Sequence, residues 1–343
     1  MKNVLKVVFV LIGTLIGAGF ASGQEIYVFF FSHGMQGILG ILISFFLMGI
    51  VIYKTLKILK KNQINTYNDF LNTLLKKYKN TKIVQIINMV INIFILVTFF
   101  IMIAGFGAYF EQELGINSII GSLILATFSF IVFTKNIKGV VKVNELIVPI
   151  LIVFLSIIGI INLKEVNILE LNKYVINLSE SNWFIDAILY CSYNSILLIP
   201  VILTLKEYLE NKRKIKLISI ITTIITIILS FIVFIILVRV DVDIKNLEMP
   251  AVYVVSKGFE ILRILYGFII LASIFTTSVS LGTSFLQNTS KNKKNYTQIA
   301  LLMCITSVLV SKIGFSNLVS LLYPIFGYLG LVQIIKIIFV KTK

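Results

Sequence analysis

Long apolar runs limit what this chain can fold into. Hydrophobic residues make up 58% of the 343 positions and charged residues 13%, and the charges lie in short clusters between the apolar runs. A helix crosses a bilayer with about 20 apolar residues. The pattern predicts an all-α polytopic membrane protein with the lipid bilayer around it. We place ten spans at residues 4–31, 35–56, 83–110, 116–134, 141–163, 183–205, 215–238, 252–287, 296–312 and 316–339.

The positive charges alternate between the loops. With both termini in the cytoplasm, all but seven of the 31 Lys and Arg residues fall on the cytoplasmic side, as the positive-inside rule requires in a cell membrane. The net charge of +16 therefore does not indicate nucleic-acid binding, for which interleaved aromatic residues and binding motifs are also missing. The sequence predicts no particular oligomeric state. The seven exceptions are Lys164, Lys173, Arg239, Lys245, Lys257, Arg263 and Lys312.

A polar segment divides the single membrane domain, residues 1–343, into two halves. Residues 164–182 are predicted to form an external linker between a first set of five spans, 1–163, and a second set, 183–343. Because five is odd, the second set inserts with the opposite orientation. Such 5+5 inverted repeats are typical of secondary transporters in which the first helix of each repeat, here helices 1 and 6, is discontinuous.

Four glycines interrupt the first span. Gly13, Gly17, Gly19 and Gly23 weaken the helix at a depth where lipid does not tolerate exposed backbone. An unwound segment offers free carbonyl and N–H groups, and this predicts a transport site. Close packing of small residues between helices is the alternative. The predicted substrate-binding residues of this segment are Gly17, Ala18, Gly19, Phe20, Ser22 and Glu25.

The sixth span has a polar centre at a corresponding depth. Polar side chains inside a membrane require partners or a cavity, so Tyr190, Tyr193, Asn194 and Ser195 are predicted to complete the substrate site. A hydrogen-bonded cluster between helices is the alternative interpretation.

The glycine run also carries a family resemblance. GTLIGAGFASGQE, residues 13–25, resembles the YkvI-like membrane proteins, and its GxxIGAG core is similar to the aromatic amino acid permeases and the wider amino acid/polyamine/cation (APC) transporters. The resemblance extends over the whole chain through its length, span count and motif position. It implies the LeuT-type fold.

That resemblance also implies a candidate sodium site. Sodium-coupled members hold the ion between carbonyls of the first helix and hydroxyls of the eighth, here the carbonyls of Gly13 and Ile16 and two of the hydroxyls of Thr276, Thr277 and Ser278. Bonding of these hydroxyls to their own helix is the alternative. Some proton-coupled relatives place a lysine of the fifth helix there, and residues 143–162 of this chain contain none. A proton could instead be carried by Glu25, Glu145 or Asp186.

Deep basic side chains are missing from the predicted spans. A substrate carboxylate would therefore depend on backbone N–H groups around Ala18 to Ala21, and a substrate ammonium on carbonyls or Glu25. An amino acid suits both. Alternatively, Phe20, Tyr190 and Tyr193 form a face for a quaternary ammonium group.

These features together predict a sodium- or proton-coupled symporter of an amino acid or similar amine-containing solute, working by alternating access. A ligand-sensing receptor subunit of the same fold, which binds without transport, is the alternative. An enzyme is not expected, because His33 stands alone in a polar turn and no nucleophile or metal-ligand motif is present. No cofactor is expected apart from the candidate sodium ion. The segment Thr66 to Tyr78 is predicted to form an amphipathic helix on the cytoplasmic surface.

Overall fold

The described part of the chain is built from helices. The computed structural model describes all residues except 1, 63, 65, 76–81, 135–136, 164–178, 180, 210, 241–243, 245–246, 259, 291 and 341–343. Most of the predicted linker, 164–182, therefore lies outside the described residues. The first half contains α1 (Lys2–Leu15), α2 (Ala18–Ala21), α3 (Gln24–Ile26), η1 (Tyr27–Phe31), α4 (Gln36–Asn62), α5 (Tyr67–Leu74), α6 (Lys82–Leu114), α7 (Ser118–Thr134) and α8 (Ile137–Leu163). The second half contains α10 (Trp183–Thr204), η4 (Lys206–Tyr208), α11 (Lys212–Leu237), α12 (Pro250–Ser256), α13 (Glu260–Thr289), α14 (Lys293–Val310), η6 (Ser311–Ile313) and α15 (Phe315–Phe339).

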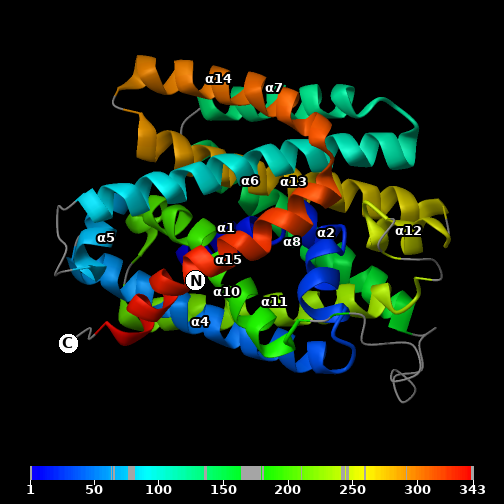
Figure 1. Cartoon of the computed structure of the whole chain (residues 1–343), viewed down its shortest axis with the longest axis horizontal. Helices are drawn as coiled ribbons and strands as arrows, with labels where there is room; N and C mark the ends of the chain where they lie inside the picture. The colour runs from blue at the N-terminus through cyan, green and yellow to red at the C-terminus, as the bar shows by residue number, and fades with distance from the viewer. Residues whose placement is uncertain are drawn as a thin grey trace.

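The long helices surround a buried centre. Helix α10 packs against α4, α15, α1 and α13, while α1 also contacts α8 and α11. Helices α7 and α14 lie side by side along one edge of the molecule, and α4 and α11 along the opposite edge (Figure 1). In the 18-residue apolar stretch of α10, 89% of the residues are buried, whereas 28% are buried in that of α14. Helix α10 therefore forms part of the interior, and α14 faces the surroundings.

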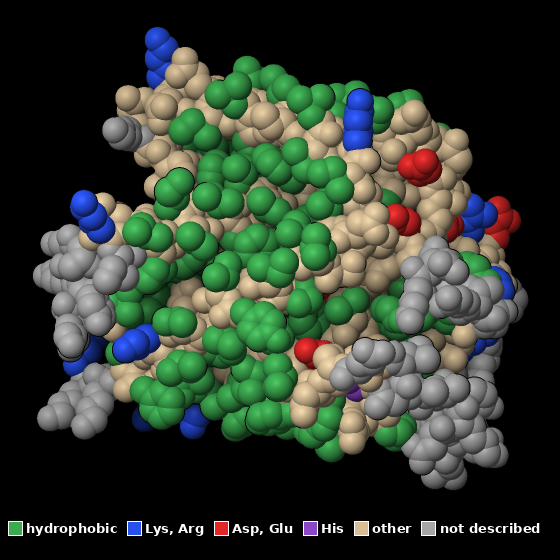
Figure 2. Space-filling view, viewed as in Figure 1, with side chains coloured by type: hydrophobic (Ala, Val, Ile, Leu, Met, Phe, Trp, Pro, Cys, Tyr) green, Lys and Arg blue, Asp and Glu red, His purple; other side chains and the backbone are tan. Residues whose placement is uncertain are grey.

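Eight of the described helices are long and apolar enough to cross a membrane: α4, α6, α8, α10, α11, α13, α14 and α15. The two other predicted spans are α7, an apolar helix of 17 residues, and the broken segment that begins with α1. Figure 2 shows hydrophobic side chains across the middle of the molecule, with Lys and Arg toward both its left and right margins and the visible acidic side chains in the right-hand half. This is the surface of a multi-pass membrane protein.

The first span is broken where the glycines predict it. The helix ends at Leu15, restarts as the four-residue α2, and is interrupted again before α3. Gly17 lies in the first break, and Gly23 in the second has φ of +86°, a left-handed conformation that favours glycine. The chain then finishes the span as a π-helical turn, Tyr27–Phe31. The predicted discontinuity of helix 1 is confirmed.

The predicted discontinuity of helix 6 is wrong. Helix α10 runs without interruption from Trp183 to Thr204 and contains Pro200. It has no glycine, and two of its polar side chains bond to their own helix: Asn194 Nδ2 donates to the Tyr190 carbonyl at 3.1 Å and Ser195 Oγ to the Cys191 carbonyl at 2.6 Å. These two bonds are compatible with a regular helix and need no break in it.

Two other predicted elements are refined. The eighth span, predicted as 252–287, consists of the short α12 followed, after a turn at Lys257 and Gly258, by α13. The amphipathic helix at Thr66 to Tyr78 is present as α5, with residues 76–78 outside the described part. Thr66 caps α5, and its apolar face is buried through Tyr67, Phe70, Leu71 and Leu74.

Candidate functional site

The first break brings together oxygens from two helices. Thr277 Oγ1 of α13 donates to the carbonyl of Gly13 at 2.7 Å and lies 3.2 Å from the carbonyl of Ile16. Thr276 Oγ1 is 3.4 Å from the Gly13 carbonyl and 3.0 Å from that of Ser273. Because α1 ends here, its last carbonyls have no partner in a following helical turn. The result is a buried group of neutral oxygen donors, the chemistry that suits sodium.

Ser278 is placed elsewhere. Its hydroxyl donates to the Phe275 carbonyl at 2.9 Å and lies 3.3 Å from Ser129 Oγ of α7. Among the hydroxyls predicted for sodium, those of Thr277 and Thr276 therefore face the broken helix and that of Ser278 does not.

Sequence reasoning missed Met102 of α6. Its sulfur accepts the backbone N–H of Ala18 at 3.4 Å. An ideal Cβ on Gly17 would lie 3.1 Å from the same sulfur and 3.1 Å from Thr277 Cγ2. Gly17 thus allows three helices to meet at the break. An apolar methionine in an apolar span gives no signal of this role.

Glu25 is the acid of the site. It is buried in α3, with 3% of its surface exposed, and its carboxylate accepts a hydrogen bond from the Tyr193 hydroxyl of α10. The side chain folds back along α2, because an ideal Cβ on Gly19 would meet Glu25 Cγ at 2.7 Å. Glu25 therefore joins the broken segment to α10.

Aromatic rings surround this contact. The Tyr193 ring stacks on Tyr323 of α15 at 4.7 Å between centroids and on Phe29 at 5.5 Å. Tyr190 makes edge contacts with Tyr193 at 5.3 Å and with Phe29 at 5.4 Å. We call Phe29, Tyr190, Tyr193 and Tyr323 the aromatic cluster. The sequence indicated the two tyrosines of α10 but not Phe29 or Tyr323.

The other residues predicted to bind the substrate are also buried, but their polar groups bond to different parts of the protein. Phe20 is fully buried in α2, and Ser22 Oγ donates to the Gly19 carbonyl at 3.2 Å. Asn194 bonds within α10, and Ser195 lies 3.7 Å from Met48 Sδ of α4. The two polar residues of α10 that follow Tyr193 are thus engaged away from the broken segment.

Helix α2 is tied to the segment between α11 and α13. Ala251 N donates to the Ser22 carbonyl at 2.8 Å, and Gln24 Nε2 donates to the Leu247 carbonyl at 2.5 Å. The Tyr266 hydroxyl of α13 donates to the Ala21 carbonyl at 2.7 Å. These bonds hold α12 and α13 against the broken segment, so the site is closed on the side that faces α12.

A cavity of about 630 Å³ lies beyond this closure, between the end of α6, α12 and the start of α15. Phe315 in its wall also borders Gly105 of α6, where an ideal Cβ would lie 2.8 Å from Ala18 Cβ. Glu248, which lines the cavity, accepts Gln24 Nε2 on its backbone carbonyl at 3.2 Å. The cavity is thus separated from the broken segment by α2 and the residues that hold it.

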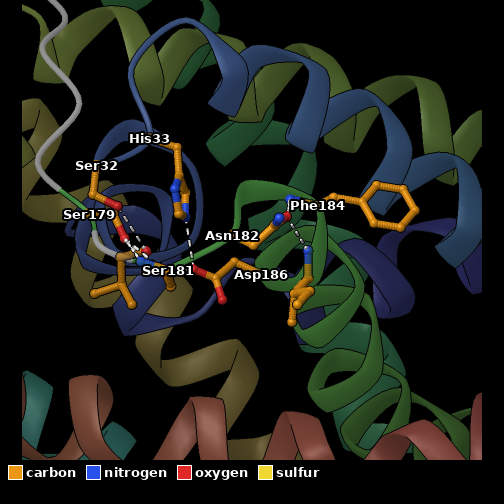
Figure 3. Close-up of polar contacts among 9 residues, drawn as sticks. Ser32, His33, Ser179, Ser181, Asn182, Phe184 and Asp186 are labelled. Atoms are coloured by element: carbon orange, nitrogen blue, oxygen red, sulfur yellow. Dashed lines mark hydrogen bonds and ion pairs between the residues drawn. The ribbon is translucent and has the colours of Figure 1, made fainter.

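The two other acids considered as proton carriers have basic partners. Glu145 Oε2 lies 3.2 Å from Lys6 Nζ. Asp186 Oδ2 lies 2.8 Å from His33 Nε2 and accepts the Ser181 hydroxyl at 2.5 Å (Figure 3). His33, expected to stand alone, is therefore paired with α10. Ser181 bonds to the carboxylate and not to the imidazole, so this trio lacks the base–nucleophile contact of a hydrolase.

The contacts of His33 fasten the end of the first span to the start of α10. Ser179 N also donates to the Ser32 carbonyl at 3.0 Å (Figure 3). We expect His33→Ala to lower the free energy of unfolding by about 1–3 kcal/mol, because Asp186 loses a partly buried partner. Thermal melting in detergent measures this, with the exposed Gln36→Ala as the control. Equal melting temperatures for the two variants would contradict a stabilising role.

Comparison with solved structures shows which fold the chain adopts. MhsT in complex with L-phenylalanine matches with a TM-score of 0.69 at 14% identity, covering 96% of this chain and 87% of MhsT. A Na⁺-coupled sialic acid symporter matches at 0.67 and 14%, covering 98% and 79%. Mhp1, a nucleobase-cation-symport-1 transporter, matches at 0.65 and 13%, covering 89% and 70%. The fold is that of the LeuT-type transporters.

Sequence relatives identify the family. The membrane protein YkvI of Bacillus subtilis (strain 168) is 30% identical over 341 residues, 95% of this chain and 92% of YkvI. YyaD of the same organism is 24% identical over 329 residues, 95% of this chain and 94% of YyaD. No protein-family model matches. This chain belongs to the YkvI family of membrane proteins.

Proposed function

We propose that this protein is a secondary active transporter that moves a small amine-containing solute together with sodium or protons by alternating access. It works in the cell membrane as ten crossings in two inverted sets of five, with both termini in the cytoplasm. The observation that carries the proposal is the contact of Thr277 and Thr276 with the carbonyls left free at the end of α1. A helix that only stabilised the fold would not need to be broken at bilayer depth, where unpaired backbone groups are unfavourable.

Sodium is the coupling ion that this geometry favours. The carbonyls of Gly13 and Ile16 and the Thr277 hydroxyl lie within hydrogen-bond distance, and a hydroxyl can turn its proton away and offer a lone pair to a cation. Glu25 supplies a buried acid for the solute or, under proton coupling, for a proton. The cavity at α12 is the route by which solute reaches α2 when its bonds to Ala251 and Tyr266 open.

Uptake by protein reconstituted in liposomes tests the proposal. Radiolabelled amines and amino acids are offered with an inward sodium gradient, an inward proton gradient, or neither. We expect accumulation of at least one solute that depends on one of the gradients. Binding without accumulation would favour a sensor of the same fold, and neither binding nor flux for any solute would overturn the proposal.

A further inference from the structure

Glu25 differs from the other acids near the spans. Lys6 accompanies Glu145 and His33 accompanies Asp186, whereas no ion pair involves Glu25 in the described part of the chain. Burial of an ionised carboxylate without a cation is strongly unfavourable. A positively charged ligand would complete this site.

The position of Glu25 also decides which substrate charge fits. Its Cγ and Cδ lie only 2.7 and 2.9 Å from the position that a Cβ on Gly19 would take. The backbone near Ala18 to Ala21, predicted to receive a substrate carboxylate, is therefore already covered by a carboxylate of the protein. A second carboxylate there would meet a like charge at short range, where the low dielectric strengthens repulsion. An amino acid held at this backbone would therefore bring two carboxylates together.

The aromatic cluster suits a cation. Tyr193 contacts the Glu25 carboxylate and stacks on Tyr323, and Tyr190 packs edge-on to Tyr193. The Tyr190 hydroxyl is buried beside the same carboxylate. Aromatic faces and hydroxyl oxygens both attract ammonium groups.

We propose that the transported solute is an organic amine cation without a carboxylate, bound through its ammonium group by Glu25 and the aromatic cluster. This inference rests on the proposed transport function. The ammonium group replaces the Tyr193 hydroxyl at the carboxylate, and the organic part of the solute lies against the tyrosine rings.

A matched set of ligands tests the charge requirement. 2-Phenylethylamine, L-phenylalanine and 2-phenylethanol share one ring and differ in their charged groups. Binding is measured by ligand-induced thermal stabilisation, and flux by uptake into liposomes. We expect the amine to bind most tightly and Glu25→Gln to weaken its binding by about 10- to 100-fold, the loss typical of a charged hydrogen bond. Glu145→Gln, which removes an acid that Lys6 accompanies, should leave amine binding unchanged.

The outcomes distinguish a failure of the amine assignment from a failure of the proposed transport function. If L-phenylalanine is taken up equally by the wild type and by Glu25→Gln, transport stands and the amine assignment is overturned. Equal binding of 2-phenylethylamine and 2-phenylethanol would also overturn it. Should Glu25→Gln fail to fold, Glu25→Asp keeps the charge with a shorter side chain. Amine binding that is weakened but retained in Glu25→Asp supports the assignment, and loss of all binding together with unchanged amino-acid uptake contradicts it.

Discussion

Replacing Thr277 with valine is expected to weaken the activation of transport by sodium. Valine keeps the shape of threonine but leaves the carbonyls of Gly13 and Ile16 without the hydroxyl that contacts them. Loss of one oxygen ligand should weaken apparent sodium affinity by about 10- to 100-fold, the equivalent of about 1.4–2.8 kcal/mol. The measurement is initial uptake as a function of sodium concentration.

The neighbouring hydroxyl provides the control. Ser278 Oγ bonds to the Phe275 carbonyl and faces Ser129, so Ser278→Ala should leave the sodium dependence unchanged. A Thr277→Val protein that retains wild-type sodium dependence would place the ion elsewhere. Uptake that follows the proton gradient equally in the wild type and in Thr277→Val would identify protons as the coupling ion.

The broken first helix could be predicted because its signal is local. Glycine weakens a helix wherever it lies, and four glycines between positions 13 and 23 are enough to mark the breaks. The partner hydroxyls at Thr276 and Thr277 came from the family resemblance. Which adjacent hydroxyl faces α1 depends on the rotation of α13, and this is fixed by tertiary packing.

The sixth helix shows where such reasoning fails. Tyrosine, serine and asparagine inside a span have the same sequence signature whether they line a break or bond within an intact helix. In α10 the bonds of Asn194 and Ser195 to their own helix preserve its regularity. The contacts of Glu25 with Tyr193 and of His33 with Asp186 join residues more than 150 positions apart, so no local pattern reveals them.

Two glycines of the break should control different parts of the site. We expect Gly19→Ala to reduce solute uptake by about tenfold or more, because the new methyl group meets Glu25 Cγ and displaces the carboxylate from Tyr193. Its sodium dependence should stay near that of the wild type, since the atoms nearest to the new methyl group belong to Glu25 and not to Thr277. Solute binding and sodium titration on the same preparation measure both effects.

Gly17→Ala is the matched variant with the opposite pattern. Its methyl group would lie 3.2 Å from Thr277 Oγ1 and 3.1 Å from Met102 Sδ, so it presses on the hydroxyl near the Gly13 carbonyl and not on Glu25. We expect weaker sodium activation with solute affinity at saturating sodium little changed. Because both substitutions add one methyl group to the same broken segment, a general loss of stability would affect the two variants alike. Opposite effects on sodium and solute would instead show that the break serves two adjacent sites, and identical effects would contradict that division.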